Sequence, residues 1–163
     1  MTANSLLQLS RIDKENVKRK DLIVVSPDML EVEEGFNVRG VNLSQEEYWS
    51  QEHVHEHVVN LACAYAAGDY VPPIVVKYNP DTQKAIIRDG HHRYRALMMA
   101  IDDGADIKSV AVMEFEGDES KQALLMLKSA NSLELTAVEK AEIYHRLVSY
   151  GYSNQEIANM VGK

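Results

Sequence analysis

A strand that runs directly into a helix at residues 85–101 is the feature that most constrains the fold. Residues 85–87 are apolar and largely β-branched, as in a buried strand. Gly90 separates this strand from residues 91–101, where apolar side chains recur at the spacing of one helix face. The core-facing positions of that helix are Ala96, Leu97 and Ala100. This junction predicts a sheet with a helix packed against it.

The junction itself has the composition of an anion site. The first N–H groups of a helix have no partner within the helix, and the helix dipole favours an anion there. Gly90 lets a phosphate approach the backbone, while Arg93 and Arg95 add positive charge. The other interpretation is that these cations pair with acidic neighbours and cover the sheet. The residues alone leave both interpretations open.

The rest of the chain divides into an α+β part and an all-helical end. Ser44 and Glu47 form a capping box that starts a helical region, and Gly68 suits the left-handed residue that ends it. The predicted strands are residues 22–25, 74–76, 85–87 and 110–115, and the predicted helices are 44–67, 91–101, 120–129 and two beyond residue 131. The change to all-helical sequence places a boundary near Asn131. We therefore predict a flexible arm at 1–20, a domain at 21–131 and a helical tail at 132–163.

Composition and charge narrow the class of protein. With 163 residues, 45% of them hydrophobic and 26% charged, the chain can bury one core. It has no apolar run of about eighteen residues and no secretory signal, so we expect a cytoplasmic protein with no membrane partner. The net charge of −8 argues against indiscriminate nucleic-acid binding, so any DNA contact must be local. The candidate basic segments are Lys14, Lys18, Arg19 and Lys20, and residues 84–95.

Residues 90–96 resemble a motif of a known superfamily. Gly90-His91-His92-Arg93-Tyr94-Arg95-Ala96 is similar to the Gly-x-x-Arg-x-x-Ala box of the ParB/sulfiredoxin superfamily. In that superfamily the box follows a hairpin, which residues 73–76 begin here with Pro-Ile-Val-Val after a link that contains Gly68. An upstream Asn-x-Arg box corresponds to residues 37–39. The resemblance implies an α+β fold with a small mixed sheet, followed by an all-helical tail.

The resemblance also implies a phosphate-binding pocket. Partition proteins of this superfamily bind CTP there and sulfiredoxins bind ATP, each with Mg²⁺. The implied nucleotide-binding residues are Arg39, Gly90, His91, His92, Arg93, Arg95 and Asn131. Sulfiredoxin activity is not expected, because that enzyme needs a Cys after the glycine of the box and this chain has His91.

A third box of the partition proteins, Glu-Asn-x-x-Arg, is only partly kept. Asn131 fits it, but Ala130 replaces the acid and Glu134 stands where the arginine is expected. In the family the acid and the asparagine help to hold the magnesium of the bound triphosphate. Asn131 is therefore the candidate Mg²⁺ ligand, through the nucleotide, and the loss of one carboxylate weakens that site.

The tail resembles the beginning of a helix-turn-helix. Thr136 with Glu139 and Ser153 with Glu156 form capping boxes, and Gly151 separates the two helices. The phrase Leu-Thr-x-x-Glu-x-Ala, from Leu135, is similar to the start of this region in ParB proteins. The implied DNA-binding residues are Ser153, Asn154, Gln155 and Lys163, with the recognition helix expected from about Lys163.

The expected function is that of a ParB-like DNA-associated protein in plasmid, phage or chromosome partition, or in related transcriptional control. Expected partners are DNA, a nucleotide, a partition motor protein and a second copy in a homodimer. Two alternatives stay open. One is a ParB-like nuclease or nucleotide hydrolase, with weak CTP or ATP hydrolysis or Mg²⁺-dependent DNA cleavage, and the other is a partner-binding module that has lost nucleotide binding.

Overall fold

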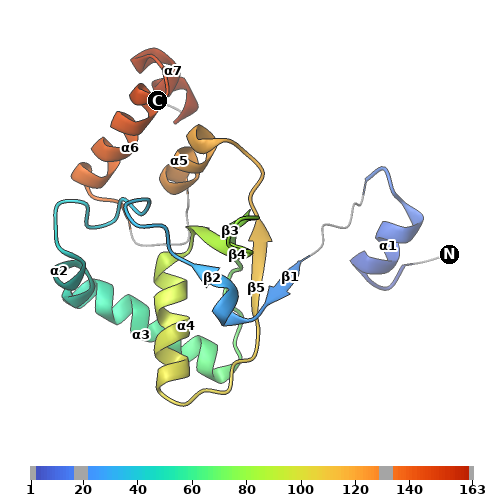
Figure 1. The fold of residues 1–163 in the computed structure, drawn as a ribbon. Helices are drawn as coiled ribbons and strands as arrows, with labels where there is room; N and C mark the ends of the chain where they lie inside the picture. Colours follow the sequence, from blue (N-terminus) through green and yellow to red (C-terminus); the bar gives the residue numbers. More distant parts are fainter. Residues whose placement is uncertain (1–2, 17–21, 129–133, 162–163) are drawn as a thin grey trace.

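The structure is a computed structural model that describes residues 3–16, 22–128 and 134–161. Helices and strands alternate through the first part, and helices alone form the last (Figure 1). The strands are β1 (Ile23–Val25), β2 (Leu30–Glu31), β3 (Ile74–Asn79), β4 (Lys84–Asp89) and β5 (Val110–Glu114). The helices are α1 (Leu6–Ile12), the short 3-10 helix η1 (Pro27–Met29), α2 (Gln45–Ser50), α3 (Glu52–Ala67), α4 (His91–Asp102), α5 (Glu119–Lys128), α6 (Ala137–Ser149) and α7 (Asn154–Met160).

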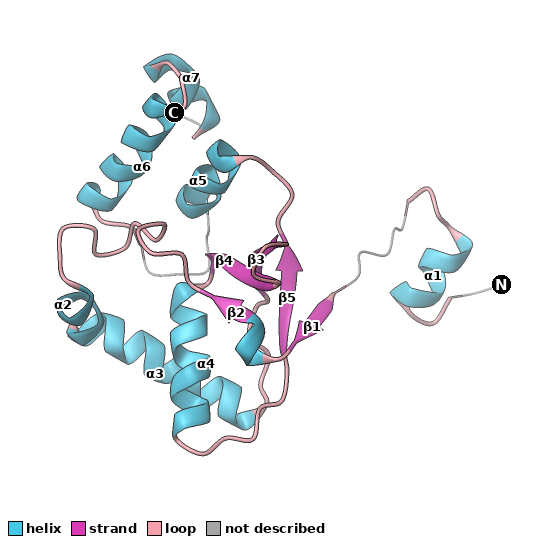
Figure 2. Cartoon of the chain, viewed as in Figure 1, coloured by secondary structure: helices cyan, strands magenta, loops and turns pink. Residues whose placement is uncertain are grey.

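The strands form one mixed sheet in the order β1-β5-β3-β4-β2. The β3–β4 and β1–β5 pairs are antiparallel, whereas β3–β5 and β2–β4 are parallel. Leu97 of α4 packs into the core with the strands, and α3 packs against α4 (Figure 2). Ile74, Ile87 and Leu97 are fully buried in the resulting core. The α+β class expected from the sequence is confirmed.

A second apolar core lies under the C-terminal helices. Helices α5, α6 and α7 pack around Ile143 and Leu147, both of which are fully buried. Val38, from the segment that precedes α2, enters the same core and is 1% exposed. Residue 131, the predicted boundary, lies outside the described residues, so the boundary stays a prediction. Helix α5 packs against α6 in this core and also contacts β4.

The helix starts and ends predicted from capping residues are present in the structure. Each of the three predicted capping boxes, at Ser44, Thr136 and Ser153, forms both of its hydrogen bonds. Gly68 ends α3 in the left-handed region with φ 74°. Three of the described elements were not predicted: α1, inside the expected arm, the 3-10 helix η1, and β2, a two-residue strand beside β4. Helix α1 has no buried residue.

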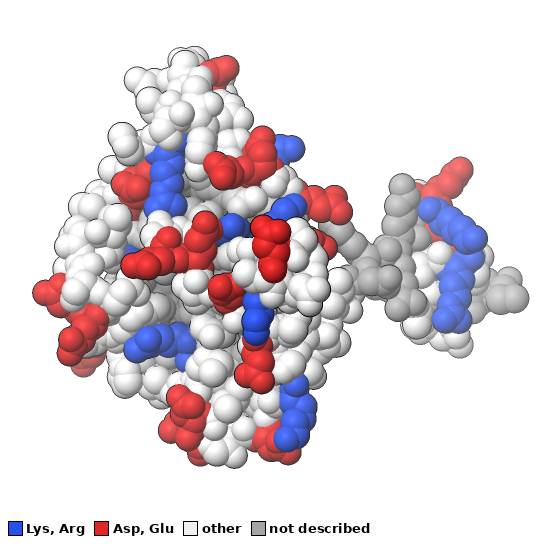
Figure 3. Space-filling model, viewed as in Figure 1, with Lys and Arg blue, Asp and Glu red and all other residues white. Residues whose placement is uncertain are grey.

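The charged side chains are mixed rather than segregated into one basic surface. On the face in Figure 3, acidic groups are spread over the body and Lys and Arg form small separate groups between them. This distribution fits the net charge of −8. Across the described parts of the chain, every helix is too short or too polar to cross a bilayer.

Candidate functional site: the corner at the start of helix α4

The corner is formed where β4 ends and α4 begins. Gly90 connects them with φ 109°, a conformation that side-chain-bearing residues rarely adopt. Its carbonyl accepts the N–H of Tyr94 at 2.8 Å, which closes the first turn of α4. The N–H groups of that first turn point out of the helix end, where they are available to an anion.

Arg93 holds the corner together. Its Nη1 donates to the carbonyls of Pro72, at 3.2 Å, and Pro73, at 2.5 Å. Its Nη2 pairs with Asp89 at 2.9 Å. A Cβ on Gly90 would lie 3.1 Å from the guanidinium carbon of Arg93, so the glycine also makes room for this clamp. Arg93 therefore has a structural role, which the sequence did not distinguish from phosphate binding. A guanidinium has five N–H donors, and these bonds do not use all of them.

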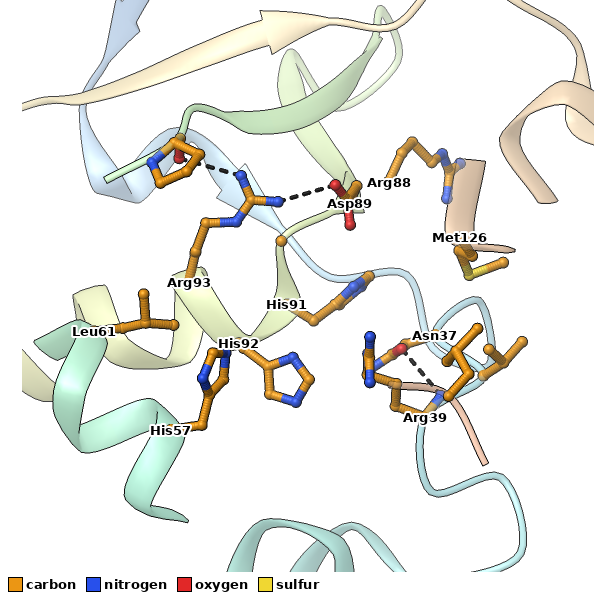
Figure 4. A pocket seen from close by; sticks show the side chains of 14 residues that line it. Asn37, Arg39, His57, Leu61, Arg88, Asp89, His91, His92, Arg93 and Met126 are labelled. Atoms are coloured by element: carbon orange, nitrogen blue, oxygen red, sulfur yellow. Dashed lines mark hydrogen bonds and ion pairs between the residues drawn. The ribbon is translucent and has the colours of Figure 1, made fainter. Parts of the chain in front are cut away.

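A small cavity of about 50 Å³ opens at this corner. Its size suits a few water-sized groups or one phosphate rather than a whole nucleotide. The cavity is lined by three arginines, Arg39, Arg88 and Arg93, and by the acidic Asp89, which is bonded to Arg93 (Figure 4). The wall is completed by residues of α3, α5 and the start of the tail, namely His57, Leu61, Met126 and Leu135.

His91 is a candidate ligand-binding side chain of this cavity. It is 9% exposed, and its Nε2 is buried with no hydrogen-bond partner among the residues that the structure describes. Burial lowers the pKa of His91 to about 4, and the nearby Arg88, Arg39 and Arg93 act in the same direction, against Asp89. The imidazole is therefore neutral at pH 7. A buried polar atom without a partner is costly, so the cavity favours a ligand that bonds to Nε2.

His92 has a different role from its neighbour. Its Nε2 shares a 2.7 Å hydrogen bond with the hydroxyl of Tyr48, and its ring meets those of Trp49 and His57 edge to face. Burial lowers the pKa of His92 to about 3 and raises that of Tyr48 to about 12. Both groups are thus neutral and bonded to each other, and they form a fixed wall.

Arg88 is a site residue that the sequence analysis did not select. It is 8% exposed, pairs with Glu33 and lies 4.1 Å from the centre of the Phe36 ring. The available signal was an arginine at the end of an apolar strand, directly before the box, where a charge is not expected without a partner. Its position depends on Phe36 and Glu33, which are distant in sequence.

Arg95 lies outside the small cavity. Its guanidinium sits 4.7 Å from the centre of the Trp49 ring and lines a larger groove of about 1020 Å³. The groove and the cavity share Asn37, Arg39 and His91. The structure thus brings together five predicted residues, Arg39, Gly90, His91, His92 and Arg93, in the cavity and places Arg95 in the adjoining groove.

Of the other five predicted residues, three lie away from the cavity and two are not described by the structure. Asn131 and Lys163 fall outside the described residues. Ser153, Asn154 and Gln155 are exposed at the start of α7, at the far end of the helical layer from α4 (Figure 1). Ser153 accepts the N–H of Glu156 as a helix cap, and Gln155 donates to Asn159. The candidate phosphate site and the candidate DNA site are therefore separate surfaces.

Comparisons with known proteins identify the fold. No protein-family model matches the chain, and a search of curated proteins also found no match. Among solved structures, the chain is similar to the C-terminally truncated chromosome-partitioning protein ParB from Caulobacter crescentus complexed to the centromeric parS site, with a TM-score of 0.54 and 22% identity. The match covers 86% of this chain and 65% of that one.

Two further structures give the same kind of match. A Pnob8-like ParB-N domain aligns over 81% of this chain and 48% of its own, with a TM-score of 0.50 and 13% identity. The Caulobacter crescentus ParB complexed with CTP-γ-S aligns over 88% of this chain and 72% of its own, with a TM-score of 0.48 and 21% identity. The chain has a ParB-like fold and spans less than two thirds of the length of the parS-bound protein.

Proposed function

We propose that this chain is a ParB-like DNA-associated protein that binds the phosphate of a nucleotide at the corner before α4. One observation carries the proposal: at a helix N-terminus, the buried Nε2 of His91 has no hydrogen-bond partner among the described residues. His91 lines the cavity together with Arg39, Arg88 and Arg93. A phosphate oxygen would accept a hydrogen bond from Nε2. The other phosphate oxygens would form charge-assisted hydrogen bonds with the guanidinium groups.

In this proposal the nucleotide occupies both the cavity and the adjoining groove. The cavity of about 50 Å³ takes a phosphate, and the groove of about 1020 Å³ has room for the sugar, the base and further phosphates. Arg39 and His91 stand at the boundary between the two hollows and contact both parts of the ligand. The expected nucleotide is CTP or ATP, with Mg²⁺ held through the phosphates and Asn131.

DNA binding is assigned to the tail. The similar Caulobacter protein is complexed to its centromeric parS site, and the present chain has the same fold. The exposed Asn154 and Gln155 at the start of α7, together with Lys163, are the proposed DNA contacts. A role in partition or related transcriptional control, a motor-protein partner and a homodimer are parts of the same proposal.

A nucleotide titration of three proteins tests the site. We expect the unmodified chain to bind CTP or ATP and His91→Ala to bind it at least about tenfold more weakly, because the hydrogen bond to a charged group is lost. His55→Ala, at an exposed histidine on α3, is the matched control and should bind normally. His91→Gln, which keeps an amide donor, should recover part of the affinity.

Two results would contradict the proposal. If CTP, ATP and GTP all fail to bind, the corner is structural and the chain is a partner-binding module. If nucleotide binds but His91→Ala and His55→Ala have equal affinity, the ligand lies elsewhere on the molecule.

A further inference from the structure

The segment at residues 35–40, called the pocket loop, connects the anion cavity to the C-terminal helices. Asn37, Val38 and Arg39 of this loop line the cavity, and the ring of Phe36 lies under the guanidinium of Arg88. The Asn37 side chain accepts the N–H of Arg39 at 3.1 Å, which fixes a local turn. The position of this loop therefore sets one wall of the cavity.

Helix α6 holds the beginning of the pocket loop through one arginine. Nη1 of Arg146 donates to the carbonyl of Phe36 and Nη2 donates to that of Gly35, both at 2.7 Å. Its Nε donates to Glu142 at 3.1 Å, within the same helix, which orients the guanidinium. Two short bonds from one rigid fork fix both the position and the direction of the chain at this point.

Helix α6 also holds the other end of the loop, through a buried carboxylate. Glu139 is 4% exposed, and one of its oxygens accepts the N–H of Gly40 at 2.7 Å, across 99 residues of sequence. Its second oxygen accepts the N–H of Thr136 at 2.8 Å and completes the capping box of α6. The same carboxylate thus starts the helix and binds the pocket loop.

Between these two ends, Val38 is inserted into the apolar core of α5, α6 and α7. The pocket loop also contacts α2, because the ring of Tyr48 packs against Gly40. Tyr48 in turn bonds His92, in the first turn of α4. A continuous chain of contacts therefore runs from α6, through the pocket loop, to the helix end that forms the anion corner.

We propose that Glu139 and Arg146 are positioning residues, which set the shape of the anion cavity from α6 without touching the ligand. This inference rests on the proposed function for its effect on ligand binding. By linkage, a ligand that binds only when the loop is held must also favour the docked position of α6. The tail and the cavity are then coupled through two named contacts.

The chain supplies a matched control for the test. Glu156 forms a capping box with Ser153 at the start of α7, as Glu139 does with Thr136 at the start of α6. Glu156 is exposed and its carboxylate accepts the N–H of Ser153, whereas the carboxylate of Glu139 also accepts the N–H of Gly40. Comparing Glu139→Gln with Glu156→Gln therefore separates the loop contact from the loss of one cap oxygen.

Hydrogen exchange and inorganic phosphate titration form the test. In Glu139→Gln we expect the Gly40 amide to exchange about tenfold to a hundredfold faster, as loss of a bond to a buried carboxylate implies. Glu156→Gln should leave that amide unchanged. Phosphate affinity should fall by about tenfold in Glu139→Gln and in Arg146→Met, and should be unchanged in Glu156→Gln.

The outcomes separate this inference from the proposed function. If the unmodified chain binds neither phosphate nor nucleotide, the proposed function fails, and Gly40 exchange still decides whether α6 positions the loop. If Gly40 exchange is equal in the Glu139 and Glu156 variants, α6 does not position the loop and the inference is wrong. It is also wrong if Gly40 exchange rises while phosphate affinity remains that of the unmodified chain.

Discussion

Gly40 lies where two parts of the molecule approach the backbone most closely. Its φ is 66°, and a Cβ there would stand 2.6 Å from ring atoms of Tyr48. Its N–H is bonded to Glu139. A single residue therefore meets two demands, a left-handed conformation and the absence of a side chain, that no other residue type satisfies.

We expect Gly40→Ala to lower the free energy of unfolding by about 2–5 kcal/mol, the sum of backbone strain and overpacking. Gly68→Ala is the control, because Gly68 has a similar φ of 74° with nothing within 4 Å of its Cβ position. That change should cost only about 1–2 kcal/mol. Urea denaturation measures both values, and equal losses would show that the contact with Tyr48 yields without cost.

The two buried histidines of α4 predict a pH dependence of stability. Burial holds the pKa of His91 at about 4 and that of His92 at about 3, below the ordinary value of 6.5. At a pH between the lowered pKa of each folded histidine and the ordinary value of 6.5, the unfolded chain binds more protons than the folded one. Lowering the pH through this range therefore favours unfolding. Their contribution is fully present above pH 6.5 and is lost as the pH falls toward 4.

Urea denaturation between pH 7.5 and 4.5 checks this expectation. The free energy of unfolding should fall with acid in the unmodified chain and less steeply in His91→Gln. His55→Gln, at an exposed position, should follow the unmodified chain. Carboxylates with a lowered pKa, such as Glu47, act in the same direction at lower pH, so the difference between variants carries the result. A His91→Gln curve parallel to the unmodified one would contradict the assignment.

At the scale of elements, the predictions that succeeded rest on local signals. The capping boxes at Ser44, Thr136 and Ser153 place helix starts within one residue, because their bonds join groups three positions apart. The β3–β4 hairpin follows from two apolar runs around a turn. Strand β2 was missed because a two-residue strand exists only through its parallel pairing with β4. Its sequence carries no periodicity to detect.

Helix α5 contacts both β4 and α6, and the sequence does not indicate the second of these contacts. The sequence placed it with the α+β domain, since the composition changes after it. In the structure Ala123 and Met126 of α5 share a buried cluster with Ile143 and Leu147 of α6. The apolar face of a helix is visible in the sequence, but the partner of that face is not.

At the scale of the whole molecule, the sheet and the C-terminal helices have separate apolar cores, and the pocket loop enters the second one through Val38. One core lies between the sheet and α4, and the other lies among α5, α6, α7 and Val38. Parts of a protein that have their own apolar cores are expected to move relative to one another. We propose that the helical tail moves as a unit, with a hinge near Asn131.

We expect CTP to raise hydrogen-exchange protection across α5, α6 and α7 together, because the cavity wall includes Met126 and Leu135. The sheet core around Ile74 and Ile87 should change little, which makes it the internal control. Protection that rises in α6 and α7 but not in α5 would put α5 with the sheet. Uniformly strong protection that ignores the ligand would mean that the tail does not switch.

The sequence by itself determined the strand, the glycine and the helix that make the anion corner, together with most helix starts. These depend on residues within a few positions of one another, whose conformational preferences act locally. Tertiary structure alone decided that Arg88 faces the cavity, that Arg95 lies on Trp49 outside it, and that Glu139 binds Gly40. The reason is that the partner of a charged side chain is set by the packing of distant segments, which no local pattern records.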